Sequence, residues 1–218
     1  MKQAIYGRDF SRSAMASNLE AILEASSKNE IKSGRQWYQD CNQFALKLAS
    51  KYGHSLEKIA GIISSLSPET RLKNNLIDTI SLLENGNEAI VTTYDNNKIK
   101  ALNILENRLD AHDHFQASIN KTASFYYNIL RPLENNRVTI DRHASRVLHG
   151  YYLTGNEAIY YNNTPKKYSI NETVYQATAS KYDLLPHCLQ AITWLAYRRL
   201  YVGKRYQDNS DHFNEIIL

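Results

Sequence analysis

Two residues in the stretch 118–146 have side chains and surroundings suited to covalent chemistry. Lys121 opens a segment with helical apolar spacing, and Asp141 follows the short apolar run 138–140 and precedes a second helical segment. A lysine amine, once deprotonated, can attack an electrophilic carbon and form a Schiff base. A nearby carboxylate can stabilise positive charge at that carbon or accept a proton. The pair therefore predicts nucleophilic chemistry assisted by a carboxylate.

Each of these residues also has a purely structural interpretation. Lys121 can be an exposed helix residue, and Asp141 can be the N-cap that accepts backbone hydrogen bonds at the start of the helix from Arg142. For either residue alone, the structural interpretation is the better one. The functional hypothesis depends on both residues and on their sequence neighbours.

Helical spacing of apolar residues dominates the chain, and no segment alternates apolar and polar residues as a half-buried strand would. The sequence predicts an all-α fold of about ten helices, with Gly34 and Gly53 separating helices near the N-terminus. Ser55 is a predicted N-cap, and the last strong helix is expected to begin near Pro186. Residues 150–168 are expected to form a long connection with one helical turn inside it.

Two short motifs resemble the helix-hairpin-helix DNA glycosylase superfamily. Residues 121–123 (KTA) match the helix start that follows the hairpin in that family, and residues 140–143 (IDRH) match its Val-Asp-X-His segment. The resemblance implies that Lys121 is the nucleophile of a bifunctional glycosylase and that Asp141 is its catalytic carboxylate. His143 is expected to be structural, capping or supporting the helix of this aspartate. More loosely, residues 36–205 resemble a group of phage proteins through the segments 60–68 (AGIISSLSP) and 189–194 (LQAITW). This second resemblance implies no chemistry.

The glycosylase resemblance also implies an architecture and a partner. It implies a single catalytic unit over residues 1–218, built from two helical subdomains that enclose a cleft. Residues 55–130 would form a central bundle ending in the hairpin, and residues 1–54 with 131–218 would form the other subdomain. The partner would be double-stranded DNA, from which a damaged or modified base is rotated into the cleft and excised. No metal or cofactor is expected, and Cys41 and Cys188 are too few to bind an iron-sulfur cluster.

Further residues are candidates for contacts with DNA. The hairpin supplies Ser118 and Asn120. Basic residues later in the chain could follow a phosphate backbone, namely Arg142, Arg146, Arg198, Arg199, Lys204 and Arg205. By the resemblance, Ser64, Ser67 and Asn75 line the base pocket, and Tyr126 is a further candidate there because aromatic rings stack on bases. Trp37 and Trp194 are expected in the core.

One departure from the family pattern motivates two other hypotheses. The family hairpin turns on glycines that let backbone amides approach a phosphate, but no glycine lies between Gly86 and Gly150. Asn120 could instead adopt the left-handed conformation that such a turn needs. The alternative is therefore a DNA-binding module that kept the fold and lost the reaction. A third hypothesis is a helical interaction protein with no nucleic-acid role.

The composition is that of a globular protein, with 43% hydrophobic residues and a net charge of +4 at pH 7. The positive excess lies after residue 120, where 12 Lys and Arg stand against 8 Asp and Glu. Such a charge is compatible with an acidic partner without requiring one. No run of ~20 apolar residues and no secretory signal occurs. We expect a cytoplasmic monomer, in the cytoplasm of the host cell if a phage encodes the chain.

Overall fold

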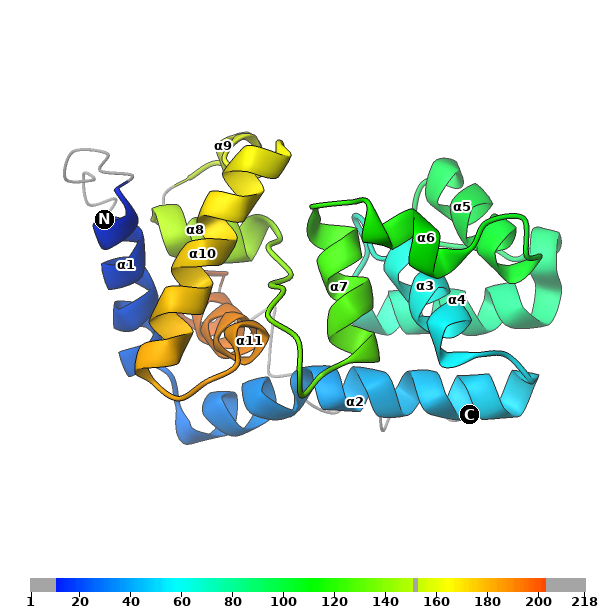
Figure 1. The fold of residues 1–218 in the computed structure, drawn as a ribbon, viewed down its shortest axis with the longest axis horizontal. Coiled ribbons are helices and arrows are strands. Elements are labelled where there is room, and N and C mark those ends of the chain that lie inside the picture. The colour runs from blue at the N-terminus through cyan, green and yellow to red at the C-terminus, as the bar shows by residue number, and fades with distance from the viewer. Residues whose placement is uncertain (1–10, 151–152, 203–218) are drawn as a thin grey trace. The chain divides into compact units, whose positions relative to one another are not determined.

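The structure is a computed structural model that describes residues 11–150 and 153–202, and all regular secondary structure in these residues is helical (Figure 1). The all-α prediction is therefore confirmed. The helices are α1 (Arg12–Glu24), α2 (Lys28–Tyr52), α3 (Leu56–Leu66), α4 (Leu72–Asn85), α5 (Asp95–Leu105), α6 (Ala111–Gln116), α7 (Lys121–Leu130), α8 (Arg142–His149), α9 (Gly155–Tyr160), α10 (Pro165–Lys181) and α11 (Pro186–Tyr197). A 3-10 turn covers Gly86–Glu88, and a π-helix covers Arg198–Val202.

The described residues form two compact units. The terminal unit consists of residues 11–37 and 136–202, and the central unit consists of residues 38–135. The division falls inside α2, whereas the glycosylase resemblance implied boundaries after residues 54 and 130. Helix α2 contributes to both units because Gly34 packs on Ile192 of the terminal unit, while the Asn42 side chain donates to the Ile129 carbonyl of the central unit.

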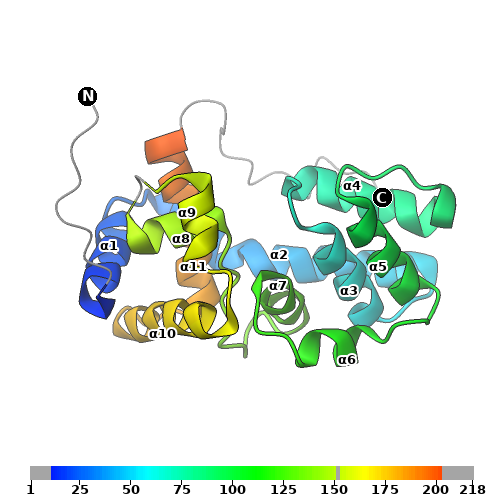
Figure 2. The ribbon, with the colours of Figure 1, turned by 90° about the horizontal axis from the view of Figure 1, so that it is seen from above.

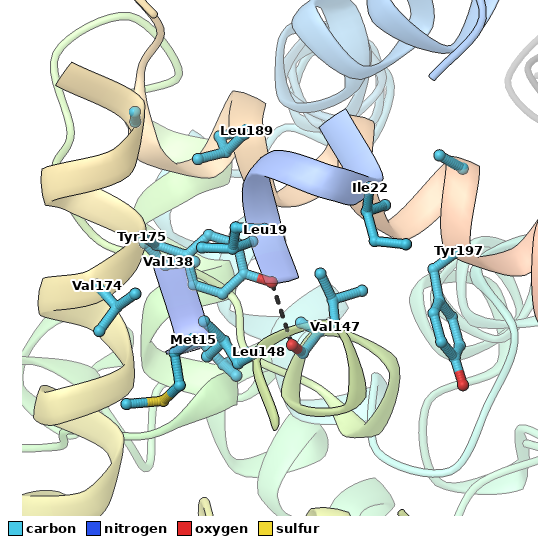
Figure 3. Close-up of a cluster of buried hydrophobic side chains, with 14 of the residues drawn as sticks. Met15, Leu19, Ile22, Val138, Val147, Leu148, Val174, Tyr175, Leu189 and Tyr197 are labelled. Atoms are coloured by element: carbon cyan, nitrogen blue, oxygen red, sulfur yellow. Dashed lines mark hydrogen bonds between the residues drawn. The ribbon is translucent and has the colours of Figure 1, made fainter. Parts of the chain in front are cut away.

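The terminal unit has its own apolar core. Helix α1 contacts α8, α10 and α11, and α11 contacts α8 and α10. The core side chains labelled in Figure 3 are Met15, Leu19, Ile22, Val138, Val147, Leu148, Val174, Tyr175, Leu189 and Tyr197. The buried Tyr175 hydroxyl donates to the Ala144 carbonyl over 3.1 Å. Burying these side chains is the main stabilising contribution to the unit, and a buried hydroxyl is tolerated because it is hydrogen-bonded.

In the central unit, α3 is surrounded by the other helices. Every residue from Ile59 to Leu66 is buried, and α3 contacts α4, α5, α6 and α7 (Figure 2). Gly61 permits the close approach of α6, because a Cβ atom at this position would lie 2.6 Å from the Cβ of Ala111. Ser55 caps the start of α3 as predicted, since its side chain accepts a hydrogen bond from the Lys58 amide.

Gly34 lies within α2 and does not end a helix there, so that prediction is wrong. A Cβ atom at Gly34 would lie 2.5 Å from Cγ1 of Ile192 and 2.6 Å from its backbone nitrogen. Glycine is therefore needed for the contact between α2 and α11. Gly53, with φ of 66°, does follow the end of α2 as expected.

The segment 150–168 is more helical than the sequence pattern indicated. It contains all of α9 and the start of α10. Thr154 and Glu157 form a capping box at α9, and Thr164 with Pro165 begins α10. These start signals were present in the sequence, but the glycine and asparagine residues around them favoured a loop.

The described residues contain no helix that is both long and apolar enough to span a membrane. Cys41 and Cys188 are buried free thiols, and burial raises the pKa of Cys188 to about 11. No group of three or more His, Cys, Asp or Glu side chains within residues 11–150 and 153–202 is arranged to hold a metal ion.

Candidate active-site residues

Lys121 is the first residue of α7 and lies in the central unit. Helices α6 and α7 are joined by residues 117–120, and Asn120 is the N-cap of α7 because its side chain accepts a hydrogen bond from the Ala123 amide over 3.0 Å. Asn120 has φ of −159°, so it does not adopt the left-handed conformation considered above. The half-buried Lys121 side chain extends to the end of α3, where Nζ lies 3.2 Å from the Ser67 carbonyl oxygen.

Three of the four predicted base-pocket residues lie around this end of α3. Ser64 is 0%, Asn75 1% and Ser67 7% exposed. The Asn75 amide nitrogen donates to the Ile63 carbonyl over 2.9 Å, which orients its Oδ1 atom. Among the described residues, Oδ1 of Asn75 and the hydroxyls of Ser64, Ser65 and Ser67 have no hydrogen-bond partner. Buried polar atoms are usually satisfied, so such a group marks a site where water or a polar ligand could bind.

Tyr126, the fourth predicted pocket residue, is fully buried and stacks on Phe115 with 4.8 Å between the ring centroids. Burial raises the pKa of its hydroxyl, and the neighbouring charges that act on it include Glu57 and Asp110. Glu57 lies in the first turn of α3, whereas Ser67 caps the opposite end of that helix. The structure therefore places Tyr126 in the α3–α6–α7 packing and not beside Ser67. Ser118 is half-buried in the α6–α7 connection.

Asp141 is the N-cap of α8 in the terminal unit, as the structural interpretation predicted. Its Oδ1 atom accepts a hydrogen bond from the Ala144 amide over 2.8 Å. Its Oδ2 atom accepts a second hydrogen bond, over 3.0 Å, from the indole nitrogen of Trp194. The half-buried carboxylate therefore has a defined orientation, with one donor for each oxygen.

The chain leading to Asp141 is held by α10. The Tyr168 hydroxyl donates to the Val138 carbonyl over 2.6 Å and accepts from the Ile140 amide over 2.9 Å. Glu172 accepts from the Val138 amide over 2.8 Å. Burial raises the pKa of Glu172, against the opposing effects of this hydrogen bond and of Arg137. These contacts anchor the extended backbone immediately before the aspartate.

Three arginines of the terminal unit gather around His143. The pKa of His143 is lowered, first by burial, and the charges of Arg142, Arg146 and Arg198 act in the same direction against the opposing charge of Asp141. Arg142 is exposed, and the Arg146 Nε atom donates to the Leu153 carbonyl over 3.0 Å. Arg198 is only 9% exposed and lies over the Trp194 ring at 4.2 Å. The predicted basic residues 142, 146 and 198 therefore lie in one region. Lys204 and Arg205 fall outside the described residues.

Arg199 has a different environment from its neighbour Arg198. Its guanidinium donates to both carboxylate oxygens of Glu30, over 2.7 and 3.0 Å, and to the Ala25 carbonyl. Burial on its own raises the pKa of Glu30, but hydrogen bonds from Arg199 and Ser27 and the charge of Arg199 outweigh burial, so this pKa lies below its ordinary value. Arg199 thus links the π-helix to the start of α2, and its guanidinium is engaged within the protein and not directed at a phosphate backbone.

We expect Arg199→Ala to destabilise the protein by about 1 to 2 kcal/mol at neutral pH, because Glu30 loses charge-assisted hydrogen bonds while the half-exposed arginine is partly screened by solvent. A carboxyl whose folded-state pKa is depressed contributes stability above its unfolded pKa of about 4.3 and loses it as the pH falls through the folded value. The difference from the unchanged protein should therefore shrink below about pH 4. Urea unfolding across pH measures it, with exposed Arg12→Ala as the control, and a difference independent of pH would contradict the ion pair.

Trp194 is the residue that sequence reasoning missed. It was expected in the core, but it is half-buried and donates to Asp141, which lies 53 positions earlier in the chain. No spacing pattern indicates a contact between segments so far apart. Lys121 belongs to the central unit and Asp141 to the terminal unit. The hydrogen bonds described for each residue are made within its own unit.

The chain belongs to a family of unknown function, DUF7178, whose model matches residues 1–200. No curated protein and no solved structure matches the chain. The family match assigns no activity to any residue.

Proposed function

We propose that the protein is a DNA glycosylase with associated abasic-site lyase activity, in which Lys121 is the nucleophile and Asp141 the catalytic carboxylate. The observation that favours this function most is the position of the Lys121 amine beside buried polar atoms without hydrogen-bond partners at the end of α3. A base rotated out of a duplex presents polar edges, and the proposal requires that the buried side chains at this end of α3 move apart to bind them. The proposal requires that the two helical subdomains enclose a cleft in which Lys121 and Asp141 reach the same nucleoside.

The proposed reaction begins when the neutral Lys121 amine attacks C1′ of the sugar. The new C–N bond forms as the glycosidic bond breaks, and the leaving base takes the electron pair and a proton from solvent. The carboxylate of Asp141 stabilises the positive charge that develops on the sugar and accepts the proton released by the amine. Opening of the sugar ring gives an imine between Lys121 and C1′, from which β-elimination breaks the DNA strand.

The direct experiment measures base release from duplexes that each contain one modified or damaged base. The unchanged protein is incubated with each member of the panel, and released bases are identified by mass spectrometry. A parallel sample with an abasic duplex and borohydride tests for the imine, because reduction converts it to a stable adduct. Release of at least one base together with an adduct is the expected result, and the absence of both across the panel would refute the enzymatic proposal.

A non-catalytic DNA-binding module is the second candidate. The connection between α6 and α7 has no glycine and no residue with positive φ, unlike a hairpin whose amides approach a phosphate. The arginines near His143 could still bind phosphates. This function predicts DNA binding that weakens with salt and no base release from any member of the panel.

Both candidates predict that Arg142 contacts a phosphate, because it is exposed next to Arg146 and Arg198. We expect Arg142→Ala to weaken DNA binding similarly for all sequences and to reduce the slope of log K against log salt by about 1. Fluorescence anisotropy at several salt concentrations measures this slope. Arg12→Ala, which removes an exposed arginine from α1 of the same unit, serves as the control. Equal slopes for the two variants would remove Arg142 from the DNA contacts.

A further inference from the structure

We propose that Trp194 is a positioning residue for Asp141, holding the carboxylate in the orientation that the reaction requires. The inference rests on the proposed glycosylase function and adds to it a residue of α11. Its central observation is the 3.0 Å hydrogen bond from the indole nitrogen of Trp194 to Oδ2 of Asp141. The motif of residues 140–143 does not include this tryptophan, and the helix cap does not need it.

Capping α8 uses only one oxygen of Asp141. The Ala144 amide donates to Oδ1, which satisfies the role of an N-cap. A carboxylate held at one oxygen can still pivot about that contact. The second donor at Oδ2 removes this freedom, and hydrogen bonds to a charged acceptor are stronger than those between neutral groups. Trp194 therefore fixes the orientation of the Asp141 carboxylate, and the stability of α8 does not require this second contact.

The indole of Trp194 is itself held by neighbouring side chains. Its ring lies 5.4 Å from the ring of Trp37, and the Arg198 guanidinium lies over it at 4.2 Å. Arg198 begins the π-helix that continues α11, while the next residue, Arg199, is anchored on Glu30. Short π-helical segments often occur at functional sites, and here one follows directly on the helix that supplies the donor.

A fixed carboxylate matters for the proposed reaction because the positive charge on the sugar exists only near the transition state. A charged group already oriented toward that position stabilises the transition state without having to reorganise during the reaction. Small displacements of such a group lower the rate substantially, while substrate binding through phosphates is unaffected. The expected signature is therefore a loss of rate without a loss of affinity.

The test uses Trp194→Phe, which keeps an aromatic ring against Trp37 and Arg198 but removes the N–H donor. We expect single-turnover base release to slow about tenfold or more, with DNA affinity changed by less than about twofold, since the lost hydrogen bond is to a charged group. The matched control is Tyr52→Phe, which also removes an aromatic donor to a carboxylate but in the central unit, where the Tyr52 hydroxyl donates to Glu84 over 2.6 Å. Base release at an unchanged rate in Trp194→Phe, or an equal loss in the control, would overturn the positioning role.

A second measurement tests the hydrogen bond independently of activity. The chain has two tryptophans, so the NMR spectrum of the whole protein should contain two indole N–H resonances. The Trp194 resonance is identified by its absence in Trp194→Phe, and Asp141→Asn should move it upfield, because the side chain loses its charge and one of its two acceptor oxygens. A Trp194 resonance that does not move would overturn the inference even if the protein releases bases. If the Trp194 resonance moves in Asp141→Asn but the protein releases no base, the hydrogen bond exists and the glycosylase function is refuted. The catalytic role of the hydrogen bond is then refuted with it.

Discussion

Replacing Lys121 by arginine should reduce the borohydride-trapped adduct with abasic DNA to the level seen without protein. Arginine keeps the positive charge and can still donate to the Ser67 carbonyl, which lies 3.2 Å from the lysine amine. The guanidinium, however, stays protonated at all practical pH values and forms no imine. The expected loss is therefore complete for trapping and for strand cleavage, while the thermal midpoint stays close to that of the unchanged protein. Gel electrophoresis of the reduced complex measures the adduct.

The matched control for this prediction is Lys98→Arg. Lys98 is also half-buried in the central unit, and its Nζ atom likewise donates to a backbone carbonyl, that of Asn87 over 2.7 Å. We expect this variant to form the adduct as the unchanged protein does. If Lys121→Arg is still trapped as efficiently as the control, the nucleophile is another amine and the role proposed for Lys121 is wrong.

Replacing Asp141 by asparagine should slow base release by about 100- to 1000-fold, the range seen when a group that stabilises transition-state charge is removed. Asparagine is as good an N-cap as aspartate, so the start of α8 should persist. The side chain loses its charge and one of its two acceptor oxygens, which limits the destabilisation to about 1 to 2 kcal/mol. Single-turnover kinetics on a substrate identified in the panel measure the rate, and denaturant unfolding measures the stability.

Asp110→Asn is the control for this substitution, because Asp110 caps α6 through the Asp113 amide and should change neither rate nor adduct. The two catalytic variants should also differ from each other. An abasic site has no base to release, so Asp141→Asn should still form the borohydride adduct through Lys121. An Asp141→Asn protein that releases base at the rate of the Asp110→Asn control would show that the carboxylate serves the helix alone.

Local signals in the sequence predicted much of the helical framework. The start of α11 was predicted near Pro186, and Ser55 and Asp141 were recognised as possible N-caps because their side chains can satisfy the amides of the following turn. The error at Gly34 has a tertiary cause. Glycine commonly separates helices, but here it lies within one because α11 approaches too closely for a side chain. Nothing in the sequence around Gly34 records the position of Ile192.

For the candidate site, too, the sequence identified residues but not the contacts between them. The sequence identified Lys121 and Asp141 from their neighbours, and it identified Ser64, Ser67 and Asn75 by resemblance. It did not indicate that Trp194 donates to Asp141 or that Arg198 and Arg199, adjacent in the chain, have different partners. Glu30 lies 169 positions before Arg199, and such pairs leave no periodic pattern.

The amino-acid sequence by itself determined that the described residues are helical and where several helices begin, including α3, α8 and α11, because apolar spacing and capping act over three or four neighbouring positions. Only the tertiary structure decided which side chains meet across the helices: the lysine at the end of α3, the indole on the aspartate, and the arginine on the buried glutamate. These contacts arise from packing between distant segments, where burial and the need to satisfy buried polar groups select the partners.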